Sequence, residues 1–336
     1  MKALVCDRPG SLSLTQRPDP IPQPGEAVIR IRRVGVCGTD FHIYGGQHPY
    51  LAYPRVMGHE LAGEVVSAPS GSELRSGETV YIVPYLSCGH CRACGRGVTN
   101  ACRNLSVLGV HQDGGMAEYL AVPAANAVPV EAVGLDEAAM IEFLAIGAHG
   151  VRRGAIGRED RVLVIGAGPI GMAAILFAAA AGAEVAALDL RQDRLDIAKA
   201  SLGAASTYML SDATPNMLRE ATGDDFFDVV IDATGNAEAI RRGLDYVGHG
   251  GRHVLLSVVR DDLVFPDPEF HKRETTLLAS RNAQPPDFAA VVAYMQAGKV
   301  PTSVLNTHRA LLADAPDRFD TWCDPAAGVI KAMLEL

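Results

Sequence analysis

The feature that most restricts the fold of this chain is an uncharged run from Val162 to Ala183, VLVIGAGPIGMAAILFAAAAGA. The run is long enough to span a bilayer. However, Gly166, Gly168 and Pro169 interrupt it near its start. A membrane helix would lose backbone hydrogen bonds there, whereas a buried strand could turn sharply into a buried helix. The run therefore predicts a strand, a tight turn and a helix, and it argues against a membrane span.

The turn has the spacing of a phosphate-binding loop. Gly166, Gly168 and Gly171 stand in G-x-G-x-x-G register between a strand-like segment, residues 161–165, and the expected helix. Glycine at these positions permits a close approach of the backbone, so that a pyrophosphate can lie at the helix N-terminus. The motif also occurs in ordinary glycine-rich turns, and its position between strand and helix is what favours a dinucleotide site.

An acidic residue closes the next expected strand. Asp189 ends residues 184–189, where its carboxylate can accept hydrogen bonds from an adenosine ribose. A carboxylate there would repel a 2′-phosphate, so NAD is favoured over NADP as the cofactor. Arg191 and Arg194 follow closely and leave NADP as the alternative.

The two halves of the chain differ in the order of their expected secondary structure. After residue 160, strand-like and helical segments alternate, which favours a doubly wound parallel sheet. The strand-like segments are residues 161–165, 184–189, 228–235, 252–258 and 275–280, and the later helical ones are residues 237–247 and 285–298. Before residue 145, short β-type runs between Gly and Pro predict an irregular, mostly β domain. The tail from Val300 is mixed, and we expect it to return to that first domain.

Length and charge narrow the possible functions. A chain of 336 residues with 48% hydrophobic residues suggests two globular domains. Its 30 Lys and Arg against 39 Asp and Glu give a formal net charge of −9, which offers no support for a nucleic-acid or anionic membrane surface. The start, MKALVCDRPG, lacks the apolar run of a secretory signal, so we expect a cytoplasmic protein.

Four cysteines lie in one short stretch with the pattern C-x2-C-x2-C-x7-C, at Cys88, Cys91, Cys94 and Cys102. In a chain without a secretion signal, clustered thiols are more typical of metal ligands than of disulfides. Four thiolates suit a structural zinc, because they leave no open position for a substrate. The alternatives are a four-iron cluster, whose fourth cysteine usually comes sooner and precedes a proline, and a loop of unliganded thiols.

A second candidate metal site combines different ligand types. Cys37 and His59 both have glycines nearby, and Glu60 follows the histidine. Alone, each would be an ordinary buried residue. With a carboxylate, they form a sulfur, nitrogen and oxygen set that suits a catalytic zinc with one open position. Glu142 is another candidate, because a charge in its otherwise apolar surroundings needs a partner, although a helix-surface position would also explain it.

The chain resembles the zinc-dependent medium-chain alcohol and polyol dehydrogenases. Four motifs together carry this resemblance: GVCGTD at 35–40, GHE at 58–60, the four-cysteine stretch and GAGPIG. Residues 106–115, 233–236 and 265–283 are similar, more narrowly, to the branch of L-galactonate and L-gulonate 5-dehydrogenases. The resemblance implies an α/β protein in which a GroES-like, mostly β catalytic domain (residues 1–146 and 282–336) adjoins a Rossmann domain (residues 147–281). It also implies an active site between the domains and a homodimer or homotetramer.

The resemblance implies roles for single residues. Cys37, His59 and Glu142 would hold the catalytic zinc, with Glu60 beside it and able to enter its shell. Thr39 would accept the substrate proton and His42 would pass it to solvent. The residues implied at the cofactor are Gly166, Gly168, Pro169, Ile170, Gly171, Asp189 and Thr234, with Arg194 over the adenine and Lys331 near the phosphates.

One reaction uses all of these parts, with NAD and two zinc ions per chain as cofactors. Zinc lowers the pKa of a secondary hydroxyl, and the nicotinamide accepts a hydride. The expected substrate is a six-carbon sugar acid, L-galactonate or L-gulonate, oxidised at C5 to D-tagaturonate or D-fructuronate. Its carboxylate would need a cation, for which Lys272 and Arg281 are candidates, although a solvated charged turn would also explain them.

Two alternatives remain open at this stage. The first keeps the enzyme class but takes a neutral polyol or L-threonine as the substrate. The second is a nucleotide-binding or zinc-sensing protein without catalysis, which would predict broken catalytic positions.

Overall fold

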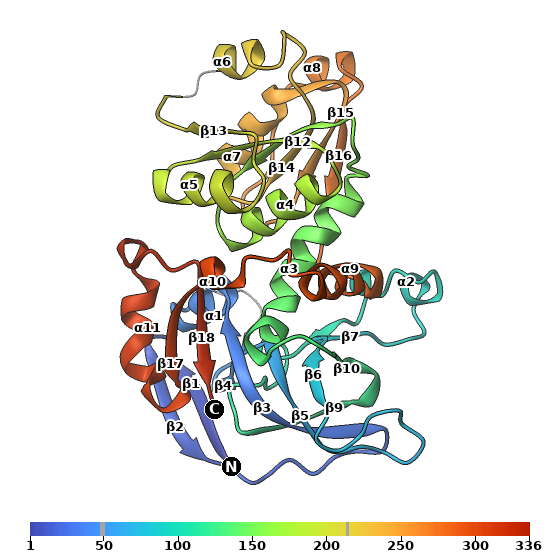
Figure 1. Ribbon diagram of the computed structural model, residues 1–336, viewed down its shortest axis with the longest axis vertical. Helices are drawn as coiled ribbons and strands as arrows, with labels where there is room; N and C mark the ends of the chain where they lie inside the picture. Colours follow the sequence, from blue (N-terminus) through green and yellow to red (C-terminus); the bar gives the residue numbers. More distant parts are fainter. Residues whose placement is uncertain (48–50, 213–214) are drawn as a thin grey trace. The chain divides into compact units, whose positions relative to one another are not determined.

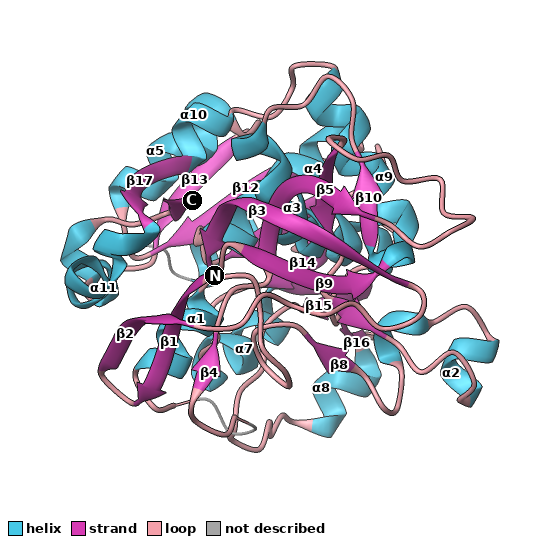
Figure 2. Ribbon diagram, turned by 90° about the horizontal axis from the view of Figure 1, so that it is seen from below, coloured by secondary structure: helices cyan, strands magenta, loops and turns pink. Residues whose placement is uncertain are grey.

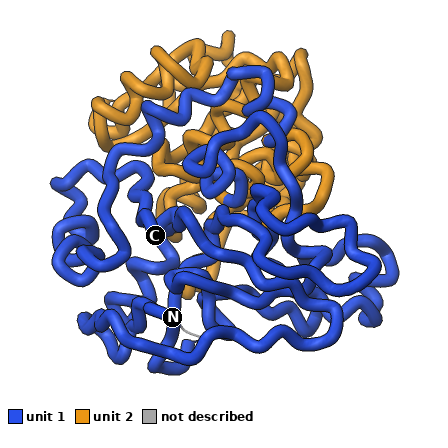
Figure 3. Tube along the Cα trace, turned by 60° about the horizontal axis from the view of Figure 1, so that its bottom comes forward, with its two compact units in different colours: residues 1–142, 292–336 blue, residues 143–291 orange. Residues whose placement is uncertain are grey.

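The computed structural model describes residues 1–47, 51–212 and 215–336, which divide into two compact units (Figure 3). Unit 1 comprises residues 1–142 and 292–336, and unit 2 comprises residues 143–291. Both limits fall inside helices, α3 (Leu135–Arg153) and α9 (Pro285–Gln296). The domain limits expected from the sequence, after residues 146 and 281, differ from these because no change of composition marks a boundary within a continuous helix.

Unit 1 is built on a seven-stranded sheet in the order β10-β6-β5-β3-β18-β17, with β9 also paired to β3. Its strands are β3 (Glu26–Val36), β5 (Glu60–Ser67), β6 (Thr79–Ile82), β9 (Tyr119–Pro123), β10 (Ala127–Pro129), β17 (Asn306–Leu311) and β18 (Lys331–Glu335). A three-stranded sheet adds β1 (Lys2–Arg8), β2 (Ser11–Gln16) and β4 (Arg55–Val56). The mostly β first domain is therefore confirmed.

The end of the chain completes this sheet. Strand β18 pairs antiparallel with β3, with Ala332 opposite Val36 (Figure 1). Ala332, Met333 and Leu334 are fully buried, because alternate residues of a central strand face the two covered sides of the sheet. This confirms that the tail returns to the first domain. Besides parts of α3 and α9, the described residues of unit 1 form the α-helices α1 (Gly38–Tyr44), α2 (Arg92–Gly95), α10 (Thr302–Leu305) and α11 (Ala315–Cys323).

Unit 2 is a doubly wound sheet, as expected. Its six strands run in the order β13-β12-β11-β14-β15-β16, and every neighbouring pair is parallel. The strands are β11 (Arg161–Ile165), β12 (Glu184–Asp189), β13 (Ser206–Met209), β14 (Phe227–Asp232), β15 (Val247–Leu255) and β16 (Thr276–Ala279). The helices α4 (Pro169–Ala180), α5 (Gln192–Ser201), α6 (Pro215–Glu220), α7 (Ala237–Gly243) and α8 (Asp267–Lys272) connect them (Figure 1).

One strand begins earlier than the sequence predicts. Strand β15 starts at Val247, within residues expected to be helical, and α7 already ends at Gly243. Gly248, Gly250 and Gly251 follow Val247, and glycine has a low strand propensity. They accompany a register shift between β14 and β15, which is the usual place for glycine inside a strand.

The uncharged run forms the strand β11, a turn and the helix α4. Val162, Leu163 and Val164 have no exposed surface, and most of α4 is buried, because both elements lie inside unit 2. In the part of the chain that the structure describes, no helix combines the length and the apolar character needed to cross a bilayer.

A buried carboxylate ties α3 to α9 inside unit 2. Asp287 accepts hydrogen bonds from Arg152 Nε at 2.6 Å and from the backbone N–H of Gln284 at 2.8 Å, and its Oδ2 lies 2.8 Å from His149 Nδ1. Burial raises the pKa of Asp287, but these hydrogen bonds outweigh it and lower the pKa from 3.8 to about 2. The carboxylate therefore stabilises the fold above pH 4, and its contribution is lost as the pH falls towards 2.

Replacing Asp287 with asparagine should lower the free energy of unfolding by about 2 kcal/mol at pH 7, because charged hydrogen bonds inside the protein are lost. Glu238→Gln is the matched control. Glu238 pairs with Arg241 and Arg242 on an exposed helix face, where such pairs contribute less than about 1 kcal/mol. Urea unfolding at pH 7 and pH 3 measures both variants, and equal losses for the two would contradict the role of Asp287.

Candidate metal centres and cofactor site

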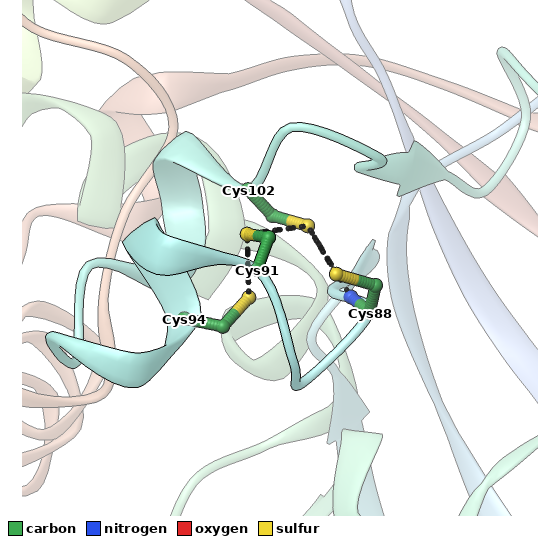
Figure 4. A group of neighbouring side chains, drawn as sticks. All are labelled: Cys88, Cys91, Cys94 and Cys102. Carbon is green, nitrogen blue, oxygen red and sulfur yellow. Dashed lines mark hydrogen bonds between the residues drawn. The ribbon is translucent and has the colours of Figure 1, made fainter.

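The four clustered cysteines converge in a lobe of unit 1. The short helix α2 and the strand β8 (Ser106–Val107) border this lobe, which is otherwise mostly loop (Figure 2). Strand β7 (Tyr85–Leu86) precedes it in the chain (Figure 1). The Sγ atoms lie 3.5 Å apart for Cys91 and Cys94, 3.9 Å for Cys91 and Cys102, and 3.4 Å for Cys102 and Cys88 (Figure 4). All four thiols are free of disulfides.

These distances fit a tetrahedral metal. With Zn–S bonds of about 2.3 Å, the sulfurs of a four-thiolate site lie about 3.8 Å apart. Backbone N–H groups of Cys94 and Arg103 lower the pKa of Cys91 to about 6, which favours the thiolate that a metal needs. The lobe therefore suits a structural zinc with a closed shell.

A second group of ligand atoms lies in the same unit. Cys37, His59 and Glu60 each place one ligand atom within 4.8 Å of the others. Among the described residues, His59 Nδ1 and Glu60 Oε2 are buried and lack a hydrogen-bond partner. Buried polar atoms are normally satisfied, so a metal ion fits this sulfur, nitrogen and oxygen set.

Glu60 reaches this position because its neighbour in the sheet is a glycine. Gly35 lies opposite Glu60 in the β3–β5 ladder, and a Cβ on Gly35 would lie 2.2 Å from Glu60 Oε2. The other oxygen, Oε1, accepts a hydrogen bond from Lys331 Nζ at 2.6 Å. Lys331 has 1% of its surface exposed. The structure thus places Lys331 in a buried ion pair, and its expected role at the cofactor phosphates stays a prediction.

Asp40 is a site residue that the sequence reasoning missed. Its fully buried carboxylate accepts hydrogen bonds from the backbone N–H of Cys37 at 2.9 Å and of Gly58 at 3.2 Å. It therefore joins the two loops that carry Cys37 and His59, and its Oδ1 lies 4.0 Å from His59 Nδ1. The signal was present, because an acidic residue three positions after Cys37 can cap the first turn of α1.

The charges of the centre call for a cation. Burial lowers the pKa of His59, but Cys37, Asp40 and Glu142 outweigh it and raise that pKa well above its usual range. Burial raises the pKa values of Asp40 and Glu142. Several anionic groups thus share one desolvated space, where a divalent ion would compensate them.

Glu142 lies near this centre but outside the group of three. It projects from α3, has 5% of its surface exposed, and accepts a hydrogen bond from the hydroxyl of Tyr85. The helix-surface alternative is therefore wrong. Since Glu60 completes the compact group, the ligand role implied for Glu142 stays a prediction.

The expected proton path begins on α1. The Thr39 hydroxyl lies 3.9 Å from Cys37 Sγ, and His42 is exposed three residues further along the same helix. Residues three apart share a helix face, so the two side chains can lie one above the other.

The cofactor residues gather at one edge of the sheet in unit 2. The glycine turn follows β11, and Thr234 follows β14, the strand on the other side of β11 from β12. This is the point where the strand order reverses, outside the carboxyl ends of the strands, where doubly wound sheets bind their ligands. A Cβ on Gly166 would lie 3.1 Å from the Thr234 methyl group, so these two loops are in contact.

Asp189 and Arg194 lie at the same edge. The Asp189 carboxylate accepts hydrogen bonds from the backbone N–H of Ala167 at 2.6 Å and of Arg191 at 2.8 Å. Arg194 packs against the glycine turn, since its Nη1 lies 3.4 Å from a Cβ placed on Gly168. Pro169 is the first residue of α4, and Ile170 is half-buried beside it.

Replacing Gly171 with alanine should destabilise the protein by about 3 kcal/mol, because its Cβ would lie 1.7 Å from the Gly166 carbonyl oxygen. Gly168→Ala is the matched change in the same turn. Its Cβ meets only Arg194 Nη1 at 3.4 Å, so the stability loss should stay below about 1 kcal/mol. If the pyrophosphate approaches this backbone, Gly168→Ala should still weaken NADH binding. Urea unfolding and NADH fluorescence titration check the pair, and a reversed order of stabilities would refute the packing argument.

The two candidate substrate cations are exposed residues of unit 2. Lys272 ends α8, has 65% of its side chain exposed and lies 3.8 Å from Glu269. Arg281 follows β16 and is also exposed. Their contact with a substrate carboxylate stays a prediction.

Comparison with known families matches both units. Residues 23–132 match the alcohol dehydrogenase GroES-like domain, and residues 169–297 match the zinc-binding dehydrogenase family.

Individual relatives share almost the whole chain. The L-galactonate-5-dehydrogenase of Escherichia coli strain K12 is 44% identical over 95% of this chain and 94% of its own. The L-threonine 3-dehydrogenase of Streptomyces coelicolor is 37% identical over 78% of each chain. Among solved structures, the alcohol dehydrogenase RspB from E. coli CFT073, in complex with NADH, aligns with a TM-score of 0.93 and 31% identity, covering 100% of this chain and 99% of that one.

Proposed function

The chain belongs to the zinc-dependent medium-chain alcohol dehydrogenases, and from that premise we propose that it oxidises the C5 hydroxyl of a six-carbon sugar acid, L-galactonate or L-gulonate, with NAD. The observation that carries this substrate class is the 44% identity, over 95% of the chain, to a protein named for its action on L-galactonate. The products would be the 5-keto acids D-tagaturonate and D-fructuronate.

The residues of unit 1 divide the chemistry among them. When bound, zinc supplies a Lewis acid for the substrate hydroxyl, and NAD supplies the hydride acceptor. Cys37, His59 and a carboxylate would hold the metal. Thr39 accepts the hydroxyl proton, and His42, which is exposed, releases it to solvent.

The environment of Asp189 favours NAD over NADP. Two backbone N–H groups fix its carboxylate at the end of β12, where it can accept hydrogen bonds from ribose hydroxyls. Arg191 is already paired with Asp193, with its Nε 3.0 Å and its Nη2 2.7 Å from the two carboxylate oxygens. A 2′-phosphate would thus meet a fixed negative charge and a cation that is already engaged.

L-Threonine is the main competing substrate. Its support is the 37% identity to an L-threonine 3-dehydrogenase, over a smaller share of the chain than the sugar-acid relative covers.

A sugar acid also requires a cation for its carboxylate, a role that we assign to Lys272 or Arg281. Alanine at each position should then raise the KM for the acid, and unchanged KM values in both variants would remove them from the substrate site.

The test is NADH formation by the purified protein with L-gulonate, L-galactonate, D-gluconate, sorbitol and L-threonine in parallel. Each reaction is repeated with NADP and with a chelator. We expect chelator-sensitive turnover of an L-aldonate with NAD. Turnover of sorbitol or L-threonine alone would retain the zinc mechanism and refute the sugar-acid substrate.

A further inference from the structure

Tyr85 has no part in the function described so far, yet its hydroxyl donates a hydrogen bond to Glu142 Oε1. Both side chains are buried, with 8% of Tyr85 and 5% of Glu142 exposed. We propose, on the basis of the function above, that Tyr85 is a positioning residue that fixes the Glu142 carboxylate at the catalytic metal centre.

The carboxylate depends on this donor because its surroundings offer little water. Glu142 lies on α3 between Ile141 and Phe143, which have no exposed surface. A carboxylate in such a place is costly unless a hydrogen bond or a cation satisfies it. The Tyr85 hydroxyl therefore restricts the orientations that Glu142 can adopt.

Tyr85 is itself held firmly by its backbone. Asn126 Nδ2 donates hydrogen bonds to the carbonyl oxygens of Val83 at 2.8 Å and of Tyr85 at 3.2 Å. The Pro84 carbonyl oxygen accepts a hydrogen bond from Leu108 N–H at 3.1 Å. Strand β7 also pairs with β8, and the four-cysteine lobe runs from one strand to the other. A metal in the lobe would close this hairpin and fix the strand that carries Tyr85.

Two buried carboxylates of the centre are thus held in chemically different ways. Glu60 has a cationic donor, Lys331, which compensates its charge. Glu142 has a neutral donor, which orients one oxygen and leaves the full negative charge for other partners. His59, Glu60 and Lys331 all lie within electrostatic reach of Glu142. A phenol in this place can orient the carboxylate without neutralising its negative charge. Hydrogen-bond partners of metal ligands commonly increase metal affinity in this way.

The test is metal affinity in the Tyr85→Phe variant, which keeps the aromatic ring and removes the hydroxyl. Cobalt(II) binding to the full chain is measured without substrate or cofactor, because its absorption spectrum distinguishes a four-thiolate site from a site with one thiolate. We expect the one-thiolate site to bind cobalt(II) 10- to 100-fold more weakly, by about the usual effect of removing such a partner. The four-thiolate site should bind as before and serves as the internal reference.

Two further variants separate positioning from general packing. Tyr81→Phe removes a hydroxyl from another buried tyrosine, in β6, whose pKa is raised to about 12 by burial alone, and it should leave the affinity unchanged. In a Glu142→Ala background, Tyr85→Phe should have no additional effect, since Tyr85 acts through Glu142. Wild-type affinity in Tyr85→Phe, or the same loss with and without Glu142, would overturn the proposal. A wrong sugar substrate would leave all of these affinities unaffected.

Discussion

Cys37→Ser is expected to lower kcat/KM by about a thousandfold while the protein stays folded. A metal ion contributes several kcal/mol to transition-state stabilisation, and each 1.4 kcal/mol corresponds to a factor of ten. Cys37 supplies the sulfur of the group formed with His59 and Glu60. Serine has nearly the same shape, but its hydroxyl stays protonated at neutral pH and is a poor zinc ligand. Because Cys37 is only half-buried and serine is nearly the same size, the substitution should leave the packing of the unit intact.

Metal analysis together with the substrate assay checks this expectation. Zinc content should fall from two ions per chain to one, and the ion that remains should be the one in the four-cysteine lobe. Cys323→Ser is the control, because it makes the same chemical change at an exposed residue at the end of α11. If Cys37→Ser kept two zinc ions and its activity, the catalytic centre would have to be sought elsewhere.

The fold was predictable where local pattern and tertiary context agree. Strands β11 and β12 have the bounds expected from the sequence, because each is an apolar run of parallel-sheet length between clear turn signals. Strand β15 was predicted too short, since its glycines match a bulge rather than a strand propensity. The limits of the two compact units fall inside helices α3 and α9, where no turn signal in the sequence marks a boundary.

The metal centres were predictable where the spacing of ligand residues in the sequence indicates a site. Four cysteines within fifteen positions are close enough in the chain for their side chains to meet, and the structure brings their sulfurs together. Tyr85 and the contact of Asp40 with Gly58 were missed because each joins distant segments, β7 with α3 and α1 with the loop before β5. No periodicity in a single sequence encodes such a pairing. Lys331 was assigned from resemblance, and only the structure shows its carboxylate partner.

Lys331→Met should destabilise the protein by about 3 kcal/mol when no metal is bound, because removing one partner of a buried ion pair leaves the other charge uncompensated. The Lys331 ammonium lies 2.6 Å from Glu60 Oε1 and 3.4 Å from the Val36 carbonyl oxygen. Methionine fills a similar volume, so the loss of charge dominates over any cavity. Urea unfolding of the metal-depleted protein measures this effect.

The double variant Lys331→Met/Glu60→Gln separates the two roles considered for Lys331. Most of the stability should return, since a neutral amide beside Gly35 no longer carries an unpaired buried charge. A double variant as unstable as Lys331→Met would show that the ion pair is not the cause. NADH binding responds differently, because a contact between Lys331 and the cofactor phosphates is lost in both variants and Glu60→Gln cannot restore it. Weaker NADH binding by about tenfold in both would therefore assign Lys331 a place at the phosphates as well, whereas unchanged binding would confine it to the support of Glu60.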